Sequence, residues 1–237
     1  MQRSDLLRET DFGGLTLERT STAHQVANAI REQLLRGEVA PGARLRDELI
    51  AASVGVSRNT VREAMQILAS EGLVRRSLHR GAVVAELSTA DLTDVYQARR
   101  VVELAGIRAA PEAPAEWLRS LHEILREMEH AVEEGSQSRL LDADVHFHEA
   151  LVATVRSHRV SRFYRQIQTE IRLSRAWSGE RPAPDVFFKR HKEIVDALDA
   201  GEFDRAESLV AHIIDDGEAR VLHGLKKGQS EAEVQGK

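Results

Sequence analysis

Three histidines and one aspartate in the second half of the chain combine residue types and positions that suit metal binding. Asp144 and His148 are four residues apart and share one face of an expected helix, while His191 and His212 lie on the apolar stripes of two later helices. Imidazole nitrogens and a carboxylate oxygen suit a borderline divalent cation such as Zn²⁺, Ni²⁺ or Mn²⁺. Taken singly, each side chain is more typical of a satisfied core histidine or an ion-pair partner than of a metal ligand, but the four together form a suitable ligand set. The sequence therefore predicts a metal site, with a purely structural cluster as the alternative.

A site of three histidines and one aspartate with an open coordination position could also activate water. That chemistry would make the protein a metal-dependent hydrolase or lyase. No glycine-rich phosphate loop or nucleophile elbow appears, and no separate general base is evident beside the four residues. We therefore expect no catalytic residues and a protein that is not an enzyme. The hydrolase or lyase stays an alternative, as does a site in which the metal itself is the sensed signal.

A second informative segment lies between Arg58 and Leu68 and has the spacing of an amphipathic helix. Its apolar stripe consists of Val61, Ala64, Met65 and Leu68. Its other face carries the hydrogen-bond donors Arg58, Asn59, Arg62 and Gln66. In the DNA major groove, Arg pairs with guanine and Asn or Gln with adenine through two hydrogen bonds each. An ordinary surface helix could have the same composition, so the neighbouring elements must decide between the two interpretations.

The neighbouring elements form the pattern of a winged helix-turn-helix. Helices are predicted at 22–36, 47–53 and 58–71, with Ser57 as a candidate N-cap and Gly55 at the turn before it. Two short strands are predicted at 73–76 and 82–85, and they make a small β-hairpin with a basic tip. At that tip, Arg80 and Gly81 could enter a minor groove. This arrangement favours a DNA-reading helix.

Charge and composition narrow the partner to duplex DNA. The chain carries a net charge of −5, but residues 20–88 hold nine Lys and Arg against seven Asp and Glu, while residues 89–237 hold 21 against 27. The basic part is therefore the expected DNA reader. It contains no Phe, Tyr or Trp, on which single-strand and RNA modules depend for stacking. The chain has no cysteine and no membrane-spanning apolar run, so we expect a cytoplasmic protein without a membrane partner.

The predicted organisation is mostly α. A flexible arm at 1–19 precedes the winged helix-turn-helix domain at 20–88. An all-α helical bundle at 89–225 follows, in which no strand pattern appears, and a disordered tail is predicted at 226–237.

The first domain resembles the DNA-binding domain of the GntR family of bacterial regulators. The resemblance covers about residues 22–85 and rests on Gly55-Val-Ser-Arg58, Val61-Arg-Glu-Ala64, Glu71-Gly-Leu-Val74 and the segment Arg36-Gly-Glu-Val-Ala-Pro-Gly-Ala-Arg-Leu45. It implies DNA contacts by Arg58, Asn59, Thr60 and Arg62, with His79, Arg80 and Gly81 at the wing. The chain departs from the family pattern at Asp47-Glu48, where the family often has an arginine after the acidic residue.

The second domain resembles the effector domain of the FadR/FCD branch of that family, over about residues 89–222. The resemblance rests on Asp144-Val-His-Phe-His148, on the segment from His191 to Gly201, and on His212-Ile213. It implies that the Asp and three His bind a metal that helps to hold a small carboxylic acid. Arg99 occupies the place of an effector-binding arginine, and a guanidinium suits a carboxylate. A pair with Glu103, four residues on, is the competing interpretation for Arg99.

Together these features predict a ligand-responsive transcriptional regulator, most simply a homodimeric repressor. Two recognition helices would read the half-sites of a palindromic double-stranded operator, since protein symmetry mirrors operator symmetry. The bundle would dimerise and bind the small carboxylate effector, which could act only through different affinities for the DNA-competent and DNA-incompetent states.

Overall fold

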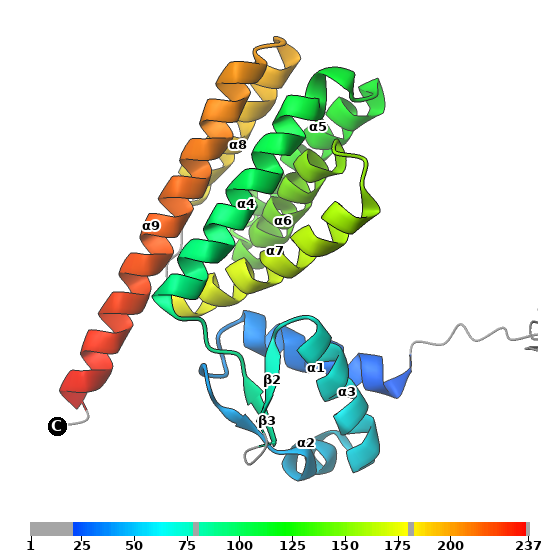
Figure 1. Ribbon diagram of the computed structural model, residues 1–237, viewed down its shortest axis with the longest axis vertical. Coiled ribbons are helices and arrows are strands. Elements are labelled where there is room, and N and C mark those ends of the chain that lie inside the picture. The colour runs from blue at the N-terminus through cyan, green and yellow to red at the C-terminus, as the bar shows by residue number, and fades with distance from the viewer. Residues whose placement is uncertain (1–20, 78–80, 180–182, 236–237) are drawn as a thin grey trace, which may run out of the picture.

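The computed structural model describes residues 21–77, 81–179 and 183–235, which fold into two domains joined end to end (Figure 1). The smaller domain, lower in Figure 1, combines helices with a small sheet, and the larger is a bundle of helices. This is the mostly α architecture, with a winged helix-turn-helix followed by a helical bundle, that the sequence predicts. The predicted flexible arm, residues 1–19, lies outside the described residues.

The first domain begins with three helices, α1 (Thr22–Leu35), α2 (Asp47–Val54) and α3 (Arg58–Ser70), and local capping fixes the junction between α2 and α3. Ser57 Oγ accepts a hydrogen bond of 3.1 Å from the backbone N–H of Thr60, which fixes the start of α3. Gly55, with φ of 68°, takes the left-handed conformation that ends α2. The two helices therefore meet at the predicted sharp turn.

A three-stranded antiparallel sheet completes the first domain. Strands β2 (Val74–Ser77) and β3 (Gly81–Val84) form the predicted hairpin, with Val74 opposite Val84. A third strand, β1 (Arg44–Leu45), pairs with the other edge of β3 and gives the order β1-β3-β2. The sequence did not predict β1, because two residues are too short to show an alternating pattern.

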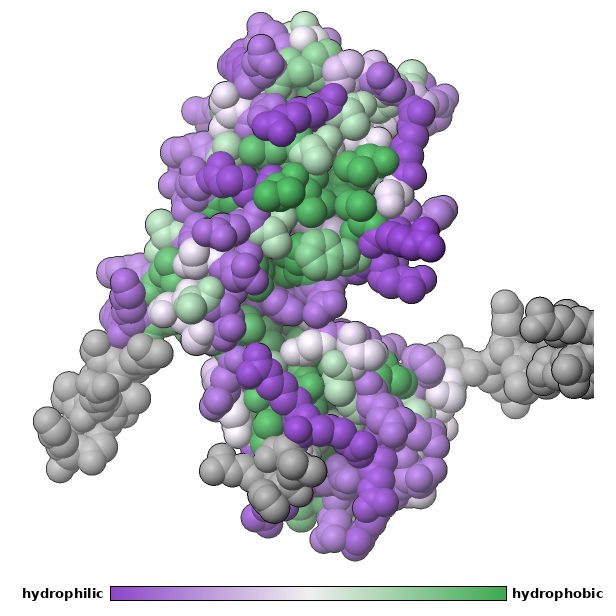
Figure 2. All heavy atoms as spheres, in the orientation of Figure 1, coloured by the Kyte–Doolittle hydropathy of each residue, from purple (hydrophilic) through white to green (hydrophobic). Residues whose placement is uncertain are grey.

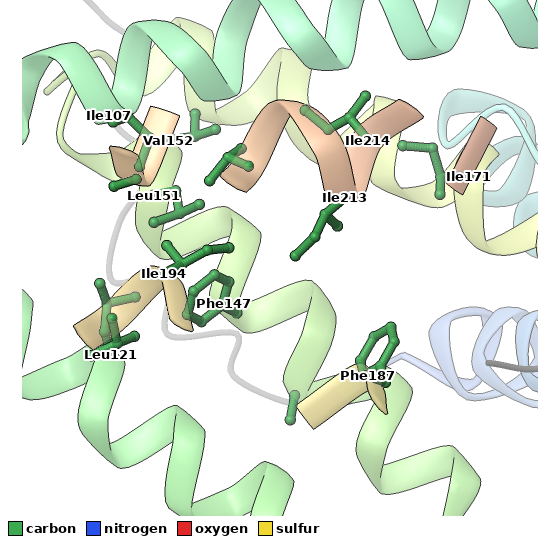
Figure 3. Packing of buried hydrophobic residues seen from close by; sticks show 14 of the residues in the cluster. Ile107, Leu121, Phe147, Leu151, Val152, Ile171, Phe187, Ile194, Ile213 and Ile214 are labelled. Atoms are coloured by element: carbon green, nitrogen blue, oxygen red, sulfur yellow. The ribbon is translucent and has the colours of Figure 1, made fainter. Parts of the chain in front are cut away.

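The second domain is a bundle of long helices connected by short loops. Its elements are α4 (Thr89–Ala109), a 3₁₀ turn (Ala110–Glu112), α5 (Ala115–Glu133), α6 (Gln137–Ala153), α7 (His158–Ser178), α8 (Pro184–Asp199) and α9 (Phe203–Gln235). A capping box starts α4, in which Ser88 Oγ accepts from the N–H of Asp91 and the Asp91 carboxylate accepts from the N–H of Ser88. In the core, Phe147 of α6 lies beside Ile194 of α8, with Leu121 of α5 nearby (Figure 3).

The end of the chain differs from the prediction. The helix α9 continues to Gln235, so the predicted disordered tail is wrong for residues 226–235. The segment is rich in Lys, Glu, Ala and Gln, which are good helix formers and can continue the preceding helix. Among the described residues, no helix is both long and apolar enough to cross a membrane.

The helix α7 belongs to both cores. Its side chains Tyr164, Ile167 and Ile171 are buried in the bundle, whereas Leu173 is buried in the core of the first domain. Trp177, one turn further on, also packs against the first domain. The two domains are therefore connected through packed side chains as well as through the chain itself.

A glycine allows α4 and α6 to approach closely. A Cβ atom on Gly106 would lie 2.3 Å from the carbonyl oxygen of Leu151, a distance that backbone atoms do not tolerate. The hydroxyl of Thr154 donates to the carbonyls of both Gly106 and Leu151 at 2.7 and 2.6 Å, so the two helices are also bonded at this point.

We expect Gly106→Ala to lower the free energy of unfolding by about 1–3 kcal/mol, because overpacking outweighs the better helix propensity of alanine. The matched control is Gly217→Ala on α9, where the new Cβ would meet the Tyr96 ring at an ordinary 3.4 Å. Urea unfolding followed by circular dichroism measures both variants. Equal stability of the two variants would contradict the close approach at Gly106.

Candidate functional site

The exposed face of α3 carries the predicted recognition residues, and two of them already have acidic partners on α2. Arg58 Nη1 lies 2.8 Å from Glu48 Oε1, and Arg62 Nε lies 3.3 Å from Asp47 Oδ2. These exposed pairs are weak and salt-screened, so a nucleic acid can displace them. The Asp47-Glu48 pair, the point of departure from the family pattern, thus holds both arginines along one edge of the helix.

The remaining predicted contacts have different environments. Asn59 is exposed and donates to Glu63 at 2.9 Å, so its amide lies on the outer face of α3. Thr60 is half-buried, and its hydroxyl lies 2.9 Å from Ser57 Oγ, where it supports the helix start. Gly81 is exposed at the start of β3 with φ of 74°, a conformation that favours glycine. His79 and Arg80 lie outside the described residues.

Inside the bundle, three of the four predicted metal ligands come together. Asp144 Oδ1 lies 3.2 Å from His148 Nε2 and 3.1 Å from His191 Nε2. All three side chains are at most 1% exposed, and their ligand atoms lie within 4.8 Å of one another. Asp144 and His148 come from α6 and His191 from α8, so packing of two helices brings one oxygen and two nitrogens to one point.

His212, the fourth predicted metal ligand, does not join this group in the structure. Its side chain is exposed on α9, near Asp216. The buried stripe of α9 instead runs through Ala206, Val210, Ile213, Ile214, Gly217 and Val221. At about 100° per residue, His212 lies well outside the arc covered by that stripe, on the solvent-facing side of α9. Only the rotation of α9 in the bundle decides that Ile213, and not His212, faces the core.

Arg99 and Glu103 form a fully buried pair on α4 beside the three ligand residues. Arg99 Nε donates to Glu103 Oε1 at 2.6 Å, and Arg99 Nη2 lies 2.8 Å from His148 Nε2. Burial opposes ionisation of Glu103, but Arg99 and His148 outweigh it and lower the pKa of Glu103 to about 2. The intrahelical pair is thus present, and Arg99 also reaches the cluster. Its Nη1 atom is buried without a hydrogen-bond partner.

Sequence reasoning missed three polar residues of α7 that complete the network: Tyr164, Gln168 and Arg175. The Tyr164 hydroxyl donates to Glu103 Oε1 and accepts from Gln168 Nε2. Arg175 Nη1 donates to Asp144 Oδ2 at 2.6 Å. Burial raises the pKa of Asp144, but Arg175 and His148 outweigh it and hold that pKa well below its usual range. The available signal was that these polar residues, at spacings of four and seven, share a helix face with the apolar Ile167 and Ile171.

The donor and acceptor pattern at His191 suits a cation. Its Nδ1 atom lies 2.8 Å from the carbonyl oxygen of Phe187, which can only accept, so Nδ1 carries a hydrogen. In the neutral imidazole, Nε2 then presents its lone pair to Asp144 Oδ1, which is also an acceptor. Two acceptors 3.1 Å apart repel each other unless a proton or a cation lies between them.

His148 has the same conflict. Arg99 can only donate, so its 2.8 Å contact requires a lone pair on His148 Nε2, although Asp144 Oδ1 lies 3.2 Å from that atom. Burial lowers the pKa of His148, but Glu103 and Asp144 outweigh burial and Arg99 and raise it. Protonation of both His148 nitrogens lets His148 donate to the carboxylates. It also places a donor on Nε2 against Arg99, which can only donate. A cation bound by both Nε2 atoms and Asp144 would relieve the two acceptor conflicts together, so the residues fit a divalent metal.

Comparisons with known proteins agree with this two-domain arrangement. Residues 22–84 match the family described as bacterial regulatory proteins, gntR family, and residues 94–216 match the FCD domain. The "Probable D-xylose utilization operon transcriptional repressor" of Paenarthrobacter nicotinovorans is 32% identical over 200 residues, which cover 83% of this chain and 87% of that protein. The gluconate operon transcriptional repressor of Bacillus licheniformis is 32% identical over 140 residues, covering 59% of this chain and 57% of that protein.

Solved structures show the same fold. A structure from Rhodococcus sp. RHA1, described as a GntR transcriptional regulator, has a TM-score of 0.72 and 34% identity, and the match covers 85% of this chain and 97% of that one. The Escherichia coli protein McbR/YncC, at 22% identity and a TM-score of 0.71, shares the fold over 86% of this chain and 99% of that one. The chain therefore belongs to the GntR family of bacterial regulatory proteins, with an FCD domain after its DNA-binding domain, and it is a DNA-binding transcriptional regulator.

Proposed function

We propose that this regulator is a cytoplasmic, homodimeric repressor whose operator affinity changes when a small carboxylate binds at a metal site in the bundle. The observation that carries the proposal is the convergence of Asp144, His148 and His191 beside Arg99 in the middle of the bundle. Repressor names among the relatives support the direction of regulation. A role as an enzyme is not needed to explain any of these contacts.

For DNA recognition, α3 would enter the major groove and present Arg58, Asn59, Thr60 and Arg62. The two arginines would exchange Glu48 and Asp47 for base edges or phosphates, and Asn59 would exchange Glu63 for a base. At the hairpin tip, His79, Arg80 and Gly81 would reach the adjacent minor groove. A palindromic operator would then provide one half-site for each protomer.

In the metal site, Asp144, His148 and His191 would be the protein ligands, and Zn²⁺, Ni²⁺ or Mn²⁺ would suit this oxygen and nitrogen set. Three protein ligands leave coordination positions for the oxygen atoms of a bound acid. The bond from His191 Nδ1 to the carbonyl of Phe187 orients the imidazole for this role.

Charge explains why the effector would be an anion. The fully buried Arg99 and the partly buried Arg175 balance two buried carboxylates, Glu103 and Asp144. A bound dication would make the interior positive, and a carboxylate would offset that charge. Arg99, with its unpartnered Nη1 atom, offers the guanidinium that would bind the acid.

Apolar surface supports the homodimer. Apolar residues gather on the face of the bundle on which α4 lies (Figures 1 and 2). Val101 of α4 is 71% exposed and Phe163 of α7 is 51% exposed, although large apolar side chains usually avoid such exposure. In a two-fold symmetric dimer one patch meets an identical patch, which suits apolar side chains better than charged ones.

For the recognition helix, we expect Arg62→Ala to weaken binding to a selected operator by about 1–3 kcal/mol, which is roughly tenfold or more in Kd. The operator is obtained by selection from random duplexes, and affinity is measured by fluorescence anisotropy. The control is Arg165→Ala, an exposed arginine on α7 in the bundle. Unchanged affinity and sequence preference in Arg62→Ala would contradict the assignment of α3.

For the metal site, elemental analysis of the purified protein should find about one Zn, Ni or Mn per chain. His148→Ala and His191→Ala should lose this metal because each removes one of three ligands. His212→Ala is the matched control and should keep it, since that side chain is exposed.

Two results would end the metal proposal: a wild-type protein that binds none of these metals, or equal metal content in wild type and His191→Ala. Circular dichroism of each variant shows that it is folded. The metal-loaded protein is then titrated with a panel of small carboxylic acids, and the effector proposal requires that at least one acid changes operator affinity.

For the dimer, Val101→Asp and Phe163→Asp should shift the protein toward monomer in sedimentation equilibrium, because each places a charge in the proposed apolar interface. Val186→Asp on α8 replaces an apolar residue that is 50% exposed and should remain dimeric. If both the Val101→Asp and the Phe163→Asp variants remain dimeric, the interface lies elsewhere.

A further inference from the structure

A cleft lies between the two domains and is lined by residues of α1 of the DNA-binding domain and of α6 and α7 of the bundle. Its volume is about 920 Å³, which is large enough for a small organic acid. Both charged and uncharged polar side chains line it. They include Arg31 and Arg36 of α1, Gln137 and Ser138 of α6, and Arg172 and Arg175 of α7.

Two helices carry polar residues from this cleft toward the buried site. On α6, Gln137 lines the cleft, and Asp144 and His148 follow after seven and eleven residues on the same face. On α7, Arg175 lines the cleft, and Gln168 and Tyr164 precede it by seven and eleven residues. The two polar stripes meet at the contact between Arg175 and Asp144.

Exposure falls sharply across that contact. The side chain of Arg175 is 16% exposed, whereas Asp144 is 1% exposed. Beyond it, His148 and Arg99 are fully buried. Among the contacts of the described residues, the ion pair between Arg175 and Asp144 therefore connects the cleft directly to the buried group.

The polar residues from Gln137 in the cleft to Arg99 in the buried site form a route between the two, and unpartnered polar atoms lie at both of its ends. At the cleft end, Gln137 Nε2 is buried without a hydrogen-bond partner. At the inner end, Arg99 Nη1 is also buried without one. Buried polar atoms usually have a partner, so such atoms indicate positions that a polar ligand can occupy.

We propose that the cleft between the domains is the entrance to the buried site and that Arg175 is its gate. The identity of what enters rests on the proposed function, namely a small carboxylate and a divalent cation. In the closed state Arg175 covers Asp144. A carboxylate arriving in the cleft is a competing partner for the Arg175 guanidinium, and a cation bound by Asp144 repels it. In either case the arginine turns away from Asp144 and the route opens.

This entrance would connect effector binding to the position of the DNA-binding domain. One wall of the cleft is α1, and the other includes α7, whose Leu173 and Trp177 pack against the first domain. Near the cleft the domains are in close contact, since a Cβ on Gly37 would lie 2.8 Å from the carbonyl oxygen of Ala176. An occupant of the route therefore touches both domains, and its affinity depends on their arrangement.

The test exploits the absence of cysteine from the chain. Ser138→Cys places one exposed thiol in the cleft, and Ser208→Cys places one on the exposed surface of α9 as the matched control. Each full-length variant is coupled to a bulky maleimide. The protein is then treated with diethyl pyrocarbonate, a small neutral reagent that modifies accessible imidazoles, and the labelling of each histidine is followed by mass spectrometry.

Blocking the cleft at position 138 should slow modification of His191 by about tenfold, because the reagent must then wait for a rarer opening of the bundle. The same adduct at position 208 should leave that rate unchanged. His223 is exposed on α9, several turns from position 208, and should react at the same rate in both proteins, which makes it an internal reference. An unchanged His191 rate in the protein blocked at 138 would overturn the proposal.

A second variant tests the gate. Arg175→Ala should speed modification of His191 by about tenfold relative to wild type, since it removes the side chain between the cleft and Asp144. Its folding is checked by circular dichroism, and the adducts at 138 and 208 decide the question if it does not fold. This readout needs no bound metal. Failure of the entrance therefore appears in the labelling rates, and failure of the proposed function appears in the elemental analysis.

Discussion

The bundle is organised around charges that cannot be left unpaired. Arg99, Glu103 and Asp144 are each at most 1% exposed, and an isolated charge at such a position would cost several kcal/mol. They are tolerated because Arg99 pairs with Glu103 and Arg175 pairs with Asp144, while His148 lies between the two carboxylates. Packed apolar side chains would stabilise the same space at least as well. The buried charges are therefore weak evidence for a stabilising role.

This network of buried charges is physically continuous with the DNA-binding domain. Its members come from α4, α6, α7 and α8, and α7 continues beyond Arg175 into the core of the DNA-binding domain. By contrast, the recognition arginines lie on an exposed face and are held by weak pairs with Asp47 and Glu48. The buried ion pairs thus lie in the bundle, at the proposed ligand site. The weak exposed pairs lie on α3, where DNA must displace them.

Much of the fold was predictable because it depends on short-range patterns. The stripe from Val61 to Leu68, the Ser57 cap and the Gly55 turn each involve residues within a few positions of one another, so the helix-turn-helix could be located from the sequence. The strand β1 could not, since its two residues show no period and it forms only by pairing with β3. The helical end of α9 was missed because polar composition indicates exposure but does not by itself exclude a helix.

For the candidate sites, the sequence alone determined which residue types share a helix face: Asp144 with His148, Arg99 with Glu103, and the donors along α3. Helical periodicity suffices for that, because it is a property of the local backbone. Only the tertiary structure decided which faces meet. It brought His191 to Asp144, left His212 exposed on α9, and added Tyr164, Gln168 and Arg175 from α7. Contacts between helices depend on their rotation and packing, which no spacing within a single helix specifies.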